Sequence, residues 1–194
     1  MIKQRTVYLL FLLVATFFVQ AQKNCKISFD EIDPFDSLHT VGSETIALGY
    51  LIPSKFEEVD GPKIIEEAEV IVLFTENDSI SGFFLNLVIP EYKLQPISSG
   101  MNVKFLLADT TVIGLYNYPD EGTFDRTINM RVYQHTCALP LDYFYLLAYH
   151  KVAQIRIEYD KQNKTLMLNE EQQLALRNAI QCLGISVGLY PIKP

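Results

Sequence analysis

The strongest match to a catalytic motif lies near the C-terminus. Gly184-Ile185-Ser186-Val187-Gly188 fits the Gly-x-Ser-x-Gly string of serine hydrolases. That motif works where a sharp strand-to-helix turn exposes the serine and a histidine follows later in the chain. Here the string follows a predicted helix, and the last histidine, His150, precedes it. We interpret the match as a coincidence and predict no catalytic residue here.

His135 and Cys137 are the only residue pair with metal-ligand spacing. Two residues apart, they would share one face of a strand, and imidazole nitrogen with thiolate sulfur is a zinc ligand set. The other histidines, His39 and His150, have no partner at ligand spacing. We therefore expect a packed thiol beside a half-buried imidazole, and we predict neither a metal nor a cofactor.

Two acidic segments are more simply interpreted as turns than as a calcium site or a catalytic loop. Four carboxylates lie between Asp30 and Asp36, but the glycine and the closing glutamate of an EF-hand loop are absent, so we predict a solvated turn. Asp109-Thr110-Thr111 differs from the Asp-Thr-Gly loop of aspartic proteases because Thr111 replaces the glycine. We expect a polar β-turn there.

The N-terminus carries the pattern of an export signal. Lys3 and Arg5 supply positive charge, an apolar run extends from Val7 to Val19, and Ala21 is the small residue that precedes a cleavage site. The run is short for a membrane span. We predict a signal peptide over residues 1–21 and one domain over residues 22–194; an uncleaved anchor and a lipid on Cys25 are the alternatives.

Composition and charge limit the class of partner. The 194 residues are 49% hydrophobic and carry a formal net charge of −7, and removing residues 1–21 with their two basic side chains leaves −9. Phosphate backbones and anionic membrane surfaces repel such a charge. We expect no nucleic-acid partner, no stable membrane span after cleavage, and a periplasmic or secreted location.

Three cysteines follow the signal. In an oxidising compartment an odd count implies one disulfide and one free thiol, or a bridge between molecules. The ends of a single domain often lie close together, and a bridge from Cys25 to Cys182 would close a loop through most of the chain. We predict that disulfide, with Cys137 as a core residue, although three positions leave the other pairs open.

Two helices are predicted in the last third of the chain. Asn169 with Gln172 three residues later has the pattern of a capping box, which predicts a helix over residues 169–183. Asp142 near the start of an aromatic stretch predicts a short helix over residues 141–150, although the tyrosines also suit a strand.

Most other segments have strand patterns joined by short turns, which lets neighbouring strands pair antiparallel. We predict an α+β domain that is mainly an antiparallel β-sheet, folded as a sandwich or a partial barrel, with a surface loop from Pro53 to Gly61. The expected strands are residues 25–29, 43–52, 70–75, 83–89, 101–108, 111–118, 128–133, 153–160 and 165–168.

Three segments resemble small exported bacterial proteins of unknown function. They are the Cys-x-x-x-x-Asp-Glu-Ile-Asp order from Cys25 to Asp33, the apolar hairpin from Met101 to Leu115, and Ala-Gln-Ile-Arg-Ile from Ala153 to Ile157. The resemblance implies export and a sheet-rich domain, and it implies no activity.

These observations favour a binding role over catalysis. We expect a non-enzymatic or envelope-associated module that binds a protein, a peptide or an envelope component through a sheet face or edge; 11 tyrosines and 12 phenylalanines supply aromatic surface. The alternative is a small secreted hydrolase whose polar groups meet only in three dimensions. A cavity that holds His135 or His150 within hydrogen-bond reach of a carboxylate or hydroxyl would favour the hydrolase.

The first testable prediction concerns processing. The exported protein is expected to begin at Gln22, because Ala21 supplies the small residue before the cleaved bond. Intact mass spectrometry of exported material measures this directly. A mass that retains residues 1–21 would contradict the prediction.

Overall fold

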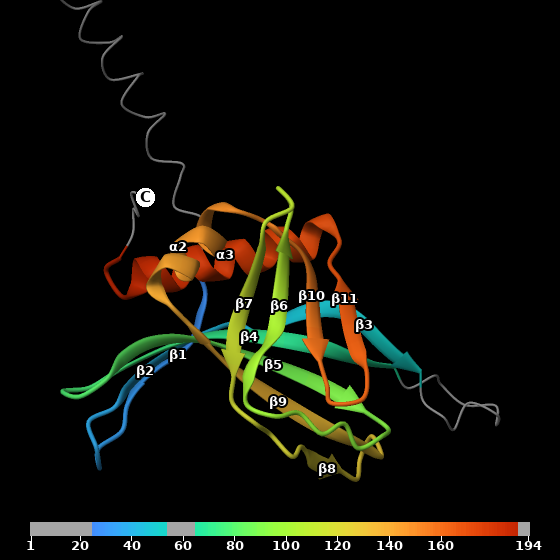
Figure 1. The fold of residues 1–194 in the computed structure, drawn as a ribbon. Helices are drawn as coiled ribbons and strands as arrows, with labels where there is room; N and C mark the ends of the chain where they lie inside the picture. The colour runs from blue at the N-terminus through green and yellow to red at the C-terminus, as the bar shows by residue number, and fades with distance from the viewer. Residues whose placement is uncertain (1–24, 54–64, 190–194) are drawn as a thin grey trace, which may run out of the picture.

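The computed structural model describes residues 25–53 and 65–189 (Figure 1). The predicted signal peptide and nearly all of the predicted loop from Pro53 to Gly61 lie outside these residues. In the described part, the strands belong to one antiparallel sheet and two helices accompany it. The predicted α+β fold is therefore confirmed.

The strands and helices follow one another with short connections. The strands are β1 (Ile27–Ile32), β2 (His39–Ser43), β3 (Ile46–Pro53), β4 (Ile65–Glu76), β5 (Ser81–Glu91), β6 (Gly100–Leu107), β7 (Val112–Asn117), β8 (Thr123–Asp125), β9 (Met130–Leu139), β10 (Val152–Glu158) and β11 (Asn163–Met167). The helices are α2 (Leu141–Tyr149) and α3 (Glu170–Ser186).

The sheet curls so that β11, at one end, comes to lie against β3, at the other. One path runs β3-β4-β5-β9-β7-β6-β10-β11, while β2 and then β1 extend the sheet from the other half of β4. The bend falls where β7 and β9 share two residue pairs, Tyr116 with Ala138 and Asn117 with Cys137. Strand β11 then contacts β3 without a ladder between them, so the barrel stays open. Figure 1 shows β6, β7, β10 and β11 running steeply across β4, β5 and β9.

Both helices cover the inner face of this curled sheet. Helix α3 starts with the predicted capping box, in which the side chains of Asn169 and Gln172 each accept from the other's backbone N–H. Its buried residues Leu176, Ile180 and Leu183 belong to the same core as the inner residues of the strands, and α2 packs against α3. None of the helices in the described residues is both long enough and apolar enough to cross a membrane.

Several predicted strands differ from the structure in their bounds, and β2 and β8 were not predicted. The strand predicted over residues 43–52 is β3, while Ser43 ends β2: its buried hydroxyl accepts from the backbone N–H of Val72 and donates to the carbonyl of Glu44, where the chain turns before β3. The strand predicted over residues 128–133 begins at Met130 and continues to Leu139. His135 lies on the inner face of β9. Because histidine is polar, it interrupts the alternation of apolar and polar residues by which a strand is recognised in a sequence.

The predicted disulfide between Cys25 and Cys182 is present, with the two Cα atoms 5.2 Å apart. It ties the start of the described chain to the last turns of α3. Cys137 is free and buried, as expected.

Replacing Cys25 and Cys182 together by alanine is expected to lower the free energy of unfolding by about 3–5 kcal/mol, since the bridge closes a very long loop in the unfolded chain. Urea denaturation of wild type and double variant measures the difference, and Cys137→Ala is the matched control that keeps the bridge. Peptide mapping without reduction that finds Cys137 in the bridge would show the assignment to be wrong.

Candidate binding surface

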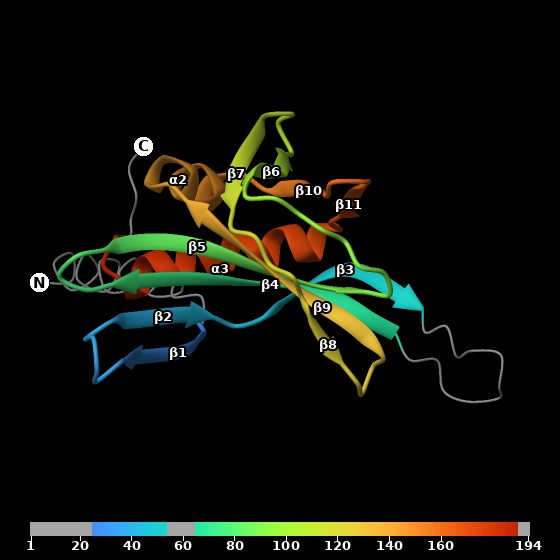
Figure 2. The same cartoon turned by 60° about the horizontal axis from the view of Figure 1, so that its bottom comes forward.

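Neither helix of the described residues lies on the outer face of β4, β5 and β9, because α2 and α3 pack on the inner face. Figure 2, which brings the bottom of the molecule forward, shows β1, β2, β4 and β5 lying side by side. Inner and outer residues alternate along these strands: in β4, Val72 and Phe74 are buried, and Leu73 between them is partly exposed.

Apolar residues line up across this outer face in one continuous row. The strand register pairs Phe29 with Gly42, Gly42 with Leu73, Leu73 with Phe84, Phe84 with Ala138, and Ala138 with Tyr116. Directly paired residues point to the same face of a sheet. We call Phe29, Leu73, Phe84, Ala138 and Tyr116 the outer row, and all five are at least partly exposed.

Gly42 is required for this row. A Cβ atom built on Gly42 would lie 2.2 Å from Cζ of Phe29, which means that the Phe29 ring lies flat over the glycine. Any larger residue at position 42 would displace the ring. The aromatic ring thus covers the backbone of β2 at Gly42, which pairs with β1 on one side and with β4 on the other.

An apolar cavity of about 520 Å³, the end cavity, opens where β9 ends, beside Phe84 and Ala138 of the outer row. Strand β9 stops pairing at Leu139, because Pro140 has no N–H and leads into α2. The cavity therefore reaches both faces of β5, with Phe83 on the inner side and Phe84 on the outer side. Tyr118 and Leu141 line its mouth and are 49% and 46% exposed.

The aromatic rings beside the end cavity are held in place. Tyr118 packs edge-on against Tyr116 with ring centroids 5.3 Å apart, and its backbone N–H donates to the carbonyl of Thr136 at 3.0 Å. Exposed tyrosines with restricted freedom are typical of protein interfaces, because they bury much area at a small entropy cost.

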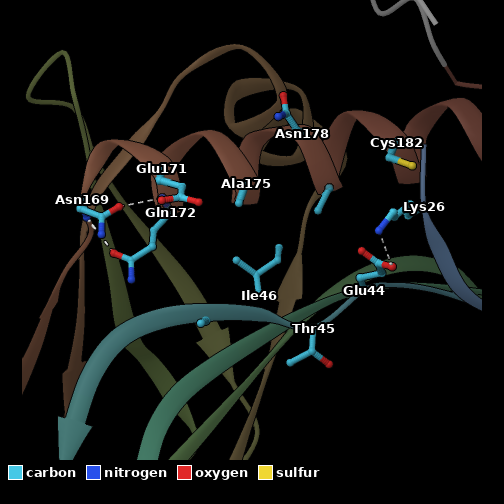
Figure 3. A pocket seen from close by; sticks show the side chains of 12 residues that line it. Lys26, Glu44, Thr45, Ile46, Asn169, Glu171, Gln172, Ala175, Asn178 and Cys182 are labelled. Carbon is cyan, nitrogen blue, oxygen red and sulfur yellow. Dashed lines mark hydrogen bonds and ion pairs between the residues drawn. The ribbon is translucent and has the colours of Figure 1, made fainter. Parts of the chain in front are cut away.

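A second cavity of about 520 Å³ lies between α3 and the β2–β3 connection (Figure 3). The apolar part of its lining includes Ile46, Ala175 and Ala179. The two alanines are small, so the helix and the β2–β3 connection leave a space between them. Several of its polar groups bond to one another: Lys26 pairs with Glu44 at 3.5 Å, and Asn169 and Gln172 form the helix cap. The residues that line it are mostly polar and, within the described part of the chain, include no aromatic side chain, whereas Phe83, Phe84 and Tyr118 line the end cavity.

His135 is completely buried and lies outside both cavities. Its Nε2 lies 2.9 Å from the hydroxyl of Tyr159, its ring stacks parallel to Tyr133, and its Nδ1 has no hydrogen-bond partner. Burial lowers the pKa of His135 to about 4, so the ring is neutral near pH 7. Burial also raises the pKa of the Cys137 thiol to about 12, which makes it unreactive.

The other two histidines form exposed pairs with carboxylates. His39 Nε2 lies 2.6 Å from Asp30, and His150 Nδ1 lies 3.2 Å from Asp109. A hydrogen bond from the Thr111 backbone is the main reason that the pKa of Asp109 is lowered. Neither pair lines either of the 520 Å³ cavities, so the cavity geometry that would favour a hydrolase is not found at them.

The remaining sequence signals have structural roles. Ser186 lies in the last turn of α3 and its hydroxyl donates to the carbonyl of Leu183 at 2.8 Å, so Gly184–Gly188 forms no nucleophile turn. Asp33 and Asp36 accept backbone N–H groups in the β1–β2 turn. Within residues 25–53 and 65–189, no group of three or more His, Cys, Asp or Glu residues could hold a metal ion.

Comparisons with known proteins add no relative. A scan against protein-family models, a search of curated proteins and a search of solved structures each find no match. The case for a binding surface therefore depends on its geometry alone.

Sequence reasoning did not single out the outer row, although one signal was present. Residues 70–74 and 83–85 are apolar at successive positions, whereas a strand with one solvated face alternates. Such runs indicate a strand with two apolar faces. The helices cover one of those faces, and the other is the outer row.

Acid is expected to destabilise the fold through His135. Its pKa of about 4 in the folded state lies below the ordinary 6.5, so between these values the unfolded chain binds more protons and stability falls as the pH falls. From pH 7.5 to pH 4.5 the loss due to this group is on the order of 2–3 kcal/mol.

Urea denaturation of wild type and of His135→Gln at both pH values gives the loss of unfolding free energy for each protein. The difference between the two losses is the contribution of His135. The exposed His150→Gln is the matched control and is expected to behave like wild type. Equal pH dependence in wild type and His135→Gln would contradict the prediction.

Proposed function

We propose that this protein is an exported, non-enzymatic binding module, and that its ligand is a segment of another protein or a peptide. The single observation that carries the proposal is the outer row, which continues across β1, β2, β4, β5, β9 and β7 and borders the end cavity at Phe84 and Ala138. A continuous apolar surface that no element of the described residues covers is a feature of interaction sites.

The chemistry of the surface favours a protein over other partners. Its contact groups are aromatic rings and aliphatic side chains, and protein interface cores are rich in the former and poor in charge. The acidic chain, with its net charge of −7, would be repelled by nucleic acid and by anionic lipid. The disulfide between Cys25 and Cys182 is compatible with an oxidising compartment, which is where we propose that the protein acts.

The outer row is testable with a photo-reactive residue. In cells that export the protein, p-benzoylphenylalanine replacing Tyr116 is expected to yield a discrete cross-linked product with a partner. Met167, on β11, is also well exposed and provides the matched control position, from which that product should be absent. Ala138→Glu introduces a charge into the row between Phe84 and Tyr116 and should reduce the product at least about tenfold.

Two results would contradict the proposal. One is the same product from positions 116 and 167, and the other is an unchanged product in a folded Ala138→Glu protein. Single replacement of His39 or His150 by alanine is expected to leave the product unchanged, whereas a role for the His150–Asp109 pair in a hydrolase would require loss of function in His150→Ala.

A further inference from the structure

Strand β5 extends beyond the end of its neighbour. The last residue pair between β5 and β9 is Phe83 with Leu139, while Ser81 and Gly82 pair only with Glu76 and Thr75 of β4. In an antiparallel strand, successive residues direct their N–H and C=O groups to alternate sides. On the side away from β4, no strand of the described residues pairs with Ser81 and Gly82, and the end cavity occupies that position.

The side chains around this gap suit one kind of occupant. Phe84, Tyr118 and Leu141 provide an apolar wall, and Glu76 places a carboxylate beside it. Successive side chains of an extended chain point to opposite faces. A segment can therefore direct an apolar side chain to the apolar wall and its neighbour to the charged group. An acyl chain could fill the apolar part but would leave the backbone groups of β5 unpaired.

We propose that this gap takes an extended segment of the partner as an added strand next to β5, with an apolar side chain in the end cavity and a lysine or arginine beside Glu76. The inference rests on the proposed binding function and specifies its ligand. Main-chain hydrogen bonds then supply affinity, and the cavity supplies selectivity.

Other free strand edges in the described residues are less suited. Strand β1 carries the exposed Asp30 and Glu31, which discourage pairing. None of the residues of β8 lines the end cavity, and β11 lies against β3. The end of β5 combines an open edge with a cavity.

The test uses a fluorescein-labelled, end-capped hexapeptide, Lys-Val-Lys-Leu-Thr-Val, whose binding to the purified protein is followed by fluorescence polarisation. Two further peptides carry N-methyl groups on either the odd or the even residues, which removes the donors of one edge at a time. One methylated peptide is expected to bind at least about tenfold more weakly and the other nearly normally, because only one edge faces β5.

Two variants probe the cavity and the charge. Leu141→Ser keeps a residue that is acceptable at the start of α2 but removes apolar surface, and it should weaken binding about five- to tenfold. Glu76→Gln should reduce the salt dependence of binding. Met167→Ser, an exposed apolar residue on β11, is the matched control and should bind like wild type.

Several outcomes would overturn the added strand. They are equal binding of both methylated peptides, no effect of Leu141→Ser, and no binding of the parent peptide at millimolar concentration. Binding of a fatty acid in place of the peptide would also overturn it. If the Tyr116 cross-link persists and depends on Ala138 while these tests fail, the binding function stands without the added strand; loss of both would remove both proposals.

Discussion

The structure depends on one constraint: a long, largely apolar sheet has few helices with which to cover its inner face. Helix α3 is the one long helix among the described residues, and its main contacts with the sheet are to β1 to β4 and β10. The sheet supplies the rest of the cover itself by curling, so that inner residues of β6 and β10, such as Phe105 and Ile155, join the core formed by β4 and β5. Burial of each large apolar side chain contributes about 1.5–3 kcal/mol, which drives this closure.

The curl is completed by a few contacts between distant parts of the chain. Lys164 of β11 forms an ion pair with Glu91 at the end of β5, and both side chains are largely buried. The disulfide between Cys25 and Cys182 fixes β1 to α3 on the other side. A buried pair of this kind contributes more to the uniqueness of an arrangement than to its free energy, because desolvation offsets the attraction.

The proposed binding surface is a consequence of the same closure. The inner faces fill the core, so the second apolar face of β4 and β5 remains outside and becomes the outer row. Pro140 ends the β9 ladder one residue before α2, and that termination leaves the end cavity beside Ser81 and Gly82. His135 and Cys137 lie on the opposite, inner face, where burial makes them a neutral base and an unreactive thiol.

Much of this fold was accessible from the sequence because the signals are local. Alternation marked β10, the Asn169–Gln172 capping box marked α3, and the odd cysteine count with distant termini led to the Cys25–Cys182 bridge. The strand β2, which ends at Ser43, and the length of β9 were not accessible, since a hydroxyl bonding to Val72 and a histidine packed on Tyr159 depend on residues far along the chain. The outer row was also decided only in three dimensions. Each of its residues is an ordinary apolar position in its own strand, and only the register across β1, β2, β4, β5, β9 and β7 brings Phe29 and Tyr116 onto one uncovered face.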